Sequence, residues 1–148
     1  MQDLKDYIVA MAAGAKKASV SLRTASAAAK NAALDAIGRS IDSHRAIIKE
    51  ANGLDVDAAK KAGLSSAMVD RLTLTDRRID DIIRGLREIA SFEDPVGGIE
   101  GVRRPSGFTL EKVRTPIGVI VMIYESRPNV TVDAAALCLK SGNAVILR

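Results

Sequence analysis

The chain has 148 residues, of which 47% are hydrophobic and 27% are charged, and its formal net charge is +4 at pH 7, values typical of one soluble globular domain with a real core. With this small positive excess, no Trp and only 3% aromatic residues, the sequence offers neither a basic face nor a stacking platform for nucleic acid. The single cysteine excludes an internal disulfide and a cysteine-based zinc site, and the longest apolar run is too short to span a membrane, so we expect a cytoplasmic protein.

The first half of the sequence predicts helices with one apolar face. Apolar residues recur at three- or four-residue spacing from Leu4 to Leu22, which predicts an N-terminal amphipathic helix. A second helix is expected to start from a cap at Thr24 or Ser26 and to end near Gly53. The residues predicted to point inward from this second helix are Leu34, Ile37, Ile41, Ile47 and Ile48.

Three shorter segments complete the predicted helical region. A short helix is expected over residues 55–59 and is expected to stop at Gly63. Ser65 is expected to cap a further helical turn, which carries Met68, Val69 and Leu72. The clearest helix begins after a cap at Thr75. Its apolar face consists of Ile79, Ile82, Ile83, Leu86 and Ile89.

The pattern changes after Pro95, Gly97 and Gly98, which end the helical region. Two stretches with loosely alternating polarity follow, at residues 99–104 and 108–114, and a Pro-Ser-Gly turn separates them. This arrangement predicts a β-hairpin.

The last 33 residues predict a strand, a helix and a second strand. Residues 117–124 are almost continuously apolar, which is typical of a parallel strand buried on both faces. A helix is expected over residues 130–140, with Gly142 placed to end it, and the second strand covers residues 144–148. This spacing is that of a parallel βαβ crossover. Since two strands do not complete such a sheet, we expect the sequence to be the front part of a larger α/β enzyme.

The turn after the first of these strands is the strongest candidate for chemistry, because ligands of open α/β sheets bind at the carboxyl ends of the strands. Arg127 offers a bidentate fork for a carboxylate or phosphate, and the amide of Asn129 can donate to an oxyanion. In the structural alternative, Asn129 or Thr131 merely caps the helix and Arg127 pairs with Glu125. The spacing alone favours this alternative, because caps are far commoner than active sites.

Other reactive side chains have structural interpretations. Cys138 lies on an apolar helix and is expected to be a packed core thiol. His44 is the only histidine and has no second metal ligand nearby, so a surface position is expected and no metal site is predicted. Arg148, taken alone, is expected to be a surface cation. No glycine-rich phosphate loop is present in the sequence.

Several stretches of the sequence resemble the γ-glutamyl phosphate reductase family, which is also called glutamate-5-semialdehyde dehydrogenase. The most specific is Tyr-Glu-Ser-Arg-Pro-Asn-Val-Thr at residues 124–131. Gly-Asn-Ala-Val-Ile-Leu-Arg at residues 142–148 is similar to a strand found across the aldehyde dehydrogenase superfamily. The likeness extends upstream through Asp-Pro-Val-Gly at residues 94–97 and Met-Val-Asp-Arg-Leu at residues 68–72, so it covers nearly the whole chain.

The resemblance implies a fold and a reaction. The fold is α/β, with an N-terminal helical region, a β-hairpin and the first βαβ unit of an incomplete Rossmann-like sheet of the aldehyde dehydrogenase type. Residues 1–93 and 116–148 would belong to the NADP-binding domain, with residues 94–115 as linker and hairpin. The reaction is the NADPH-dependent reduction of γ-glutamyl phosphate to glutamate-5-semialdehyde in proline biosynthesis, by an enzyme that forms a homo-oligomer when full length.

The resemblance also implies roles for individual residues. Asn129 would be the oxyanion donor and Arg127 would bind substrate, which makes both slight favourites over the structural alternative. The nucleophilic cysteine of the family lies in a later domain, and Cys138 does not correspond to it, so these 148 residues alone are expected to be inactive. The residues expected to line NADP are Met122, Ile123, Tyr124, Glu125 and Arg148.

Two other functions stay open at this point. A related aldehyde or acyl-thioester dehydrogenase would share the fold but act on another substrate. A non-catalytic helical interaction module would fold stably without reductase activity.

Overall fold

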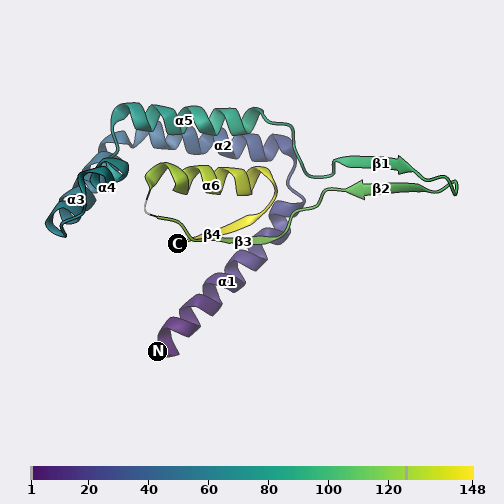
Figure 1. The fold of residues 1–148 in the computed structure, drawn as a ribbon, viewed down its shortest axis with the longest axis horizontal. Coiled ribbons are helices and arrows are strands. Elements are labelled where there is room, and N and C mark those ends of the chain that lie inside the picture. Colours follow the sequence, from purple (N-terminus) through teal and green to yellow (C-terminus); the bar gives the residue numbers. More distant parts are fainter. Residues whose placement is uncertain (1, 126) are drawn as a thin grey trace.

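A computed structural model describes residues 2–125 and 127–148 of the chain. The predicted order of a helical region, a hairpin and a strand–helix–strand unit is confirmed (Figure 1). The elements are α1 (Gln2–Arg23), α2 (Ala27–Ser43), α3 (Arg45–Lys61), α4 (Ser66–Leu72), α5 (Asp76–Ser91), β1 (Ile99–Arg103), β2 (Thr109–Val113), β3 (Val119–Met122), α6 (Pro128–Lys140) and β4 (Ala144–Leu147).

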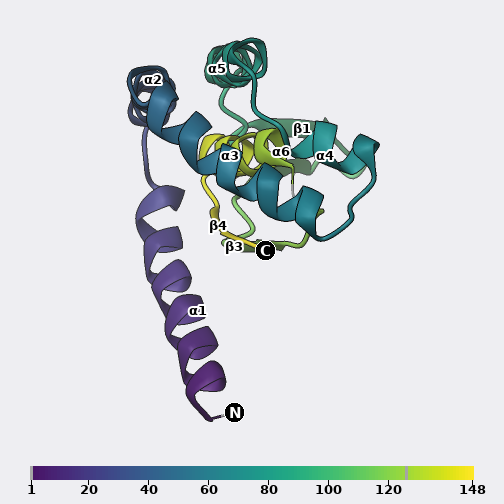
Figure 2. The ribbon, with the colours of Figure 1, turned by 90° about the vertical axis from the view of Figure 1, so that its left-hand side faces the viewer.

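The centre of the molecule is built from helices stacked on a small parallel sheet. Strands β3 and β4 pair in parallel, α6 packs against β4, and α2 and α5 lie together on α6 (Figure 1). Helix α1 contacts both strands and then diverges from the other elements toward the N-terminus (Figure 2). The antiparallel hairpin of β1 and β2 projects away from this body, and all its strand residues are exposed.

The apolar face of α5 forms most of the core, as its spacing predicts. All five residues predicted for this face are buried. Leu86 and Ile89 pack in one cluster with Leu34 of α2 and Ala136 of α6. Because three helices meet at this cluster, packing among its residues fixes the position of α6. It thereby also fixes the position of the segment that carries the candidate site.

Side-chain caps fix the starts of three helices. The Ser26 hydroxyl accepts a hydrogen bond from the Ala29 amide at 3.2 Å, so Ser26 and not Thr24 caps α2. Ser65 and Thr75 cap α4 and α5 as predicted.

The prediction for the region after α2 was wrong. The second helix ends at Ser43, with His44 as its cap, instead of continuing to Gly53. A new helix, α3, then runs without interruption through residues 55–59 to Lys61. Gly53 has an ordinary helical backbone with open space around it, so nothing there forces the helix to end. Ile37 and Ile47, which were predicted to point inward from one helix, are instead exposed.

Within the described residues the first parallel strand is not buried on both faces, in keeping with a sheet of which only two strands are present. β3 spans only four residues, and Ile117, Val121 and Ile123 are 83%, 61% and 80% exposed. Val121 and Ile123 lie two positions apart, so the pleat of an extended chain places them on one face, whereas the bend at Gly118, with φ of 117°, separates Ile117 from this alternation. Within residues 2–125 and 127–148 this face has no layer packed over it, whereas Ile120 and Met122 are partly covered.

Two boundaries near the C-terminus also differ from the prediction. α6 starts at Pro128 and not at residue 130. Proline suits the first position of a helix, because the amide hydrogen of that position has no partner within the helix and its loss costs nothing. β4 ends at Leu147, although Arg148 continues the hydrogen bonding between the two strands. Gly142, with φ of 72°, ends the turn after α6 as predicted.

A buried polar cluster joins three distant parts of the chain. The Lys30 ammonium group of α2 lies 2.6 Å from a carboxylate oxygen of Asp94, which follows α5. Lys140, at the end of α6, donates to the side-chain oxygen of Asn31 at 2.7 Å and to the Ala90 carbonyl at 2.8 Å. Both lysines are buried.

None of the helices that the structure describes is long and apolar enough to cross a membrane.

Candidate functional site

The carboxyl ends of β3 and β4 meet at one edge of the sheet. Met122 lies opposite Leu147, and the ladder continues beyond both strands. The Arg148 amide donates to the Met122 carbonyl and the Tyr124 amide donates to the Arg148 carbonyl, both at 2.9 Å. The structure therefore brings the predicted cofactor residues, which are residues 122–125 and Arg148, to a single edge.

The start of α6 lies beside this edge, held there by a hydrogen bond of 2.6 Å between the hydroxyl groups of Tyr124 and Thr131. Arg127 takes the cap position of the helix without a side-chain capping bond. Neither Asn129 nor Thr131 caps α6, so this part of the structural alternative is wrong. Asn129 is exposed in the first turn of the helix.

The other part of the structural alternative, an ion pair of Arg127 with Glu125, is present. The Arg127 Nη2 atom lies 3.4 Å from a carboxylate oxygen of Glu125. The same oxygen lies 3.8 Å from Nη1 of Arg71, which belongs to α4. Sequence reasoning missed Arg71, because no local pattern relates a residue in a short helix to a turn more than fifty positions later. Ser126, which belongs to the family-like run, lies outside the described residues.

A groove with a volume of about 690 Å³ runs between α5, the segment before it and the start of α6. Arg71, Arg78 and Arg127 line it together with Asn129, so the predicted oxyanion donor shares one hollow with three guanidinium groups. The remaining lining residues include Thr73, Leu74, Phe92, Pro128 and Leu137.

Burial affects two titratable side chains of α6. Burial raises the pKa of the Asp133 carboxyl, which also lines the groove, and it raises the pKa of the Cys138 thiol. Cys138 is buried, as the sequence predicts, so its reactive thiolate form is disfavoured.

His44 is exposed, as expected, and its Nδ1 lies 2.7 Å from the Ser40 carbonyl oxygen. Within the described part of the chain no cluster of three His, Cys, Asp or Glu residues suits a metal ion.

Solved structures of two proteins resemble this chain in both fold and sequence. The γ-glutamyl phosphate reductase of Thermotoga maritima aligns with a TM-score of 0.84 and 43% identity over 90% of this chain and 33% of its own. The γ-glutamyl phosphate reductase of Saccharomyces cerevisiae aligns with a TM-score of 0.84 and 36% identity over 90% of this chain and 34% of its own. This chain thus spans about a third of the length of either structure. No protein-family model matches it.

Proposed function

Because this chain has the fold of the N-terminal part of γ-glutamyl phosphate reductases, we propose that it is the N-terminal part of such an enzyme. The proposed reaction converts γ-glutamyl phosphate and NADPH into glutamate-5-semialdehyde, phosphate and NADP⁺. The observation that supports the site is the meeting of the two strand ends with the start of α6, where Asn129 and Arg127 line one groove. The enzyme would act in the cytoplasm in proline biosynthesis and, when full length, as a homo-oligomer.

The residues at the sheet edge fit a nicotinamide cofactor. Residues 122–124 and Arg148 lie at the paired carboxyl ends of the two parallel strands, where such ligands bind, and Arg148 adds an exposed cation. The Arg148 guanidinium would favour the 2′-phosphate of NADP over the free ribose hydroxyl of NAD. When bound, the cofactor supplies the hydride. We assign residues 1–93 and 116–148 to the cofactor domain and residues 94–115 to a linker with the hairpin.

The chain's own residues would prepare the acyl group for attack. The side-chain amide of Asn129 would donate to the carbonyl oxygen, which gains negative charge when a nucleophile adds. Arg127 would hold an anionic group of the substrate. In the proposed sequence a cysteine thiolate attacks the acyl carbon, phosphate leaves and a thioester remains, whose reduction by hydride yields the aldehyde and the free thiolate. Cys138 is too buried for this step, so we place the nucleophile in the part of the enzyme beyond these residues.

The test is an assay of the full-length protein in the reverse direction. With glutamate-5-semialdehyde, NADP⁺ and inorganic phosphate, we expect NADPH formation that depends on phosphate, measured by absorbance. The 148-residue chain alone is expected to be inactive. Faster turnover of simple aldehydes than of glutamate-5-semialdehyde would instead identify a related dehydrogenase. A full-length protein that folds but forms no NADPH would indicate a non-catalytic module.

Two substitutions separate a catalytic side chain from a structural one in that assay. Asn129→Ala is expected to lower kcat by about 100-fold, the usual loss when one oxyanion donor is removed. Cys138→Ala is expected to leave kcat within about twofold, since a packed thiol takes no part in the reaction. A loss of activity in the cysteine variant, with normal folding by circular dichroism, would contradict these assignments.

A further inference from the structure

Three charged side chains from two distant segments converge beside the candidate site. Glu125 lies between Arg71 of α4 and Arg127 at the cap of α6. One of its carboxylate oxygens is 3.8 Å from Nη1 of Arg71 and 3.4 Å from Nη2 of Arg127. Both separations exceed the distance of about 2.7 to 2.9 Å of a direct hydrogen bond between charged groups. The three side chains are also 53%, 56% and 42% exposed, in the order Arg71, Glu125, Arg127. These ion pairs are therefore loose, and their charges are available to a ligand.

Arg127 has additional capacity to donate hydrogen bonds. Its Nε atom is buried and has no hydrogen-bond partner among the described residues. A buried donor without a partner is costly, and a ligand that accepted its hydrogen bond would remove that cost.

The cluster stands where two hollows adjoin. Arg71 and Arg127 line both the groove of about 690 Å³ and a smaller hollow of about 120 Å³. Glu125 lines the smaller hollow, together with the apolar side chains of Leu64, Met68 and Leu72. Asn129 lines the larger groove. A ligand whose reacting carbon lay near Asn129 could therefore extend its other end toward the three charges.

We propose that Arg71, Arg127 and Glu125 bind the head group of an α-amino acid, with the two guanidinium groups on its carboxylate and the Glu125 carboxylate on its ammonium group. This inference rests on the proposed function, in which the substrate is a glutamyl group with such a head at the end opposite its acyl phosphate. Arg71 is then a specificity residue that α4 contributes, and Glu125 binds substrate and not cofactor.

The signs of the charges favour this ligand over a phosphate group. Two cations flanking one carboxylate complement the separated charges of an amino-acid head group. A phosphate would meet the repulsion of Glu125 at short range, and it would leave the carboxylate without a cationic partner of its own.

The test compares three aldehydes in the full-length protein with NADP⁺ and phosphate. Glutamate-5-semialdehyde carries the whole head group, 5-oxopentanoate keeps only the carboxylate, and pentanal lacks both charges. Arg71→Met is expected to raise the KM of the first two aldehydes by about 10- to 100-fold, as expected when a charged hydrogen bond is lost, and that of pentanal by less than about twofold. Glu125→Gln is expected to raise the KM of glutamate-5-semialdehyde alone. In both variants the KM of NADP⁺ is expected to stay within about twofold.

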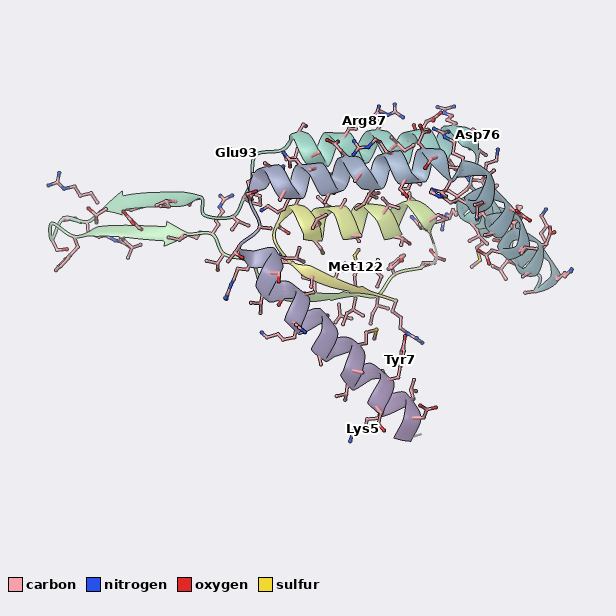
Figure 3. The ribbon with its side chains drawn as sticks, turned by 180° about the vertical axis from the view of Figure 1, so that it is seen from behind. Lys5, Tyr7, Asp76, Arg87, Glu93 and Met122 are labelled. Carbon is pink, nitrogen blue, oxygen red and sulfur yellow. The ribbon has the colours of Figure 1, made fainter. Side chains whose placement is uncertain are left out.

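Arg87→Met is the matched control, because Arg87 lies on the outer face of α5, away from α6 (Figure 3), and forms no ion pair among the described residues. It is expected to leave every KM unchanged, and Arg71→Lys is expected to recover part of the loss. A rise in the KM of NADP⁺ in the Arg71 variant would overturn the proposal in favour of a cofactor phosphate. Equal effects on all three aldehydes would show a merely structural role. An inactive wild-type protein would instead contradict the proposed function itself.

Discussion

Asp94→Asn is expected to lower the free energy of unfolding by about 3 to 4 kcal/mol, because it leaves the Lys30 ammonium group buried without a counter-charge. Lys30 is only 1% exposed, and its Nζ atom lies 2.7 and 2.6 Å from the two Asp94 oxygens. The neutral amide keeps the shape of the carboxylate but not its charge. The loss is measured as a lower midpoint of urea unfolding, followed by far-ultraviolet circular dichroism.

The same interaction gives the protein a defined sensitivity to acid. Burial alone would raise the pKa of Asp94, but hydrogen bonds from Lys30 and the Val96 amide, with the charges of Lys30 and Lys140, outweigh this and hold the pKa below its usual range. Such a carboxylate stabilises the fold fully above its unfolded-state pKa of about 3.9. That stabilisation is lost as the pH falls through the lower folded-state pKa, so unfolding of the wild type should depend more steeply on acid than unfolding of Asp94→Asn.

Two variants test whether the buried charge is the cause. Adding Lys30→Met to Asp94→Asn is expected to recover most of the loss, because the uncharged methionine side chain leaves no ammonium group buried without a counter-charge. Asp80→Asn removes an exposed carboxylate from Arg45 and is expected to shift the midpoint little. If the double variant were no more stable than Asp94→Asn alone, the charge argument would fail.

Gly142→Ala is expected to destabilise the protein by about 2 to 5 kcal/mol through strain and crowding together. The φ of 72° at Gly142 costs an L-residue about 1 to 2 kcal/mol. A Cβ atom there would also lie 2.9 Å from Cγ of Pro116, and 3.3 Å from the Leu22 carbonyl oxygen and from Cγ2 of Val96. Overpacking of this kind adds about 1 to 3 kcal/mol. The free energy of unfolding from urea titration checks the sum.

Gly63→Ala is the matched control for the backbone term. Gly63 has nearly the same φ, 76°, but a Cβ atom there meets nothing within 4 Å. It is expected to cost only the conformational part, about 1 to 2 kcal/mol. Equal losses in the two alanine variants would mean that the crowding around Gly142 relaxes without cost.

The turn at Gly142 also sets the register of the two parallel strands. The side-chain oxygen of Asn143, which is buried, accepts a hydrogen bond of 2.8 Å from the Gly118 amide, and its amide group donates to Ser141. These bonds hold the start of β4 level with the start of β3. The carboxyl ends of the strands, where the candidate cofactor residues lie, are aligned as a consequence.

Local sequence patterns predicted some elements correctly and misplaced others for identifiable reasons. The spacing of the apolar residues in α5 and the caps at Ser65 and Thr75 were confirmed, since helix faces and caps depend on residues only a few positions apart. The helix break at His44 was missed, because Gly53 gave the stronger local stop signal. The apolar run over residues 117–124 predicted a strand, but it did not show which faces of that strand are buried, because composition alone does not show which elements pack on them.

The sequence by itself determined the succession of helices, hairpin and parallel strands, and it pointed to the turn after β3 as the candidate site, because periodicity, caps and turn residues act over a few positions. Only the tertiary structure decided which distant side chains meet. Lys30 and Asp94 are separated by 64 positions, and Lys140 and Asn31 by 109. Arg71 of α4 likewise comes within 3.8 Å of Glu125, which follows β3, across more than fifty positions. Such contacts follow from how whole elements pack against one another, and no local pattern contains that information.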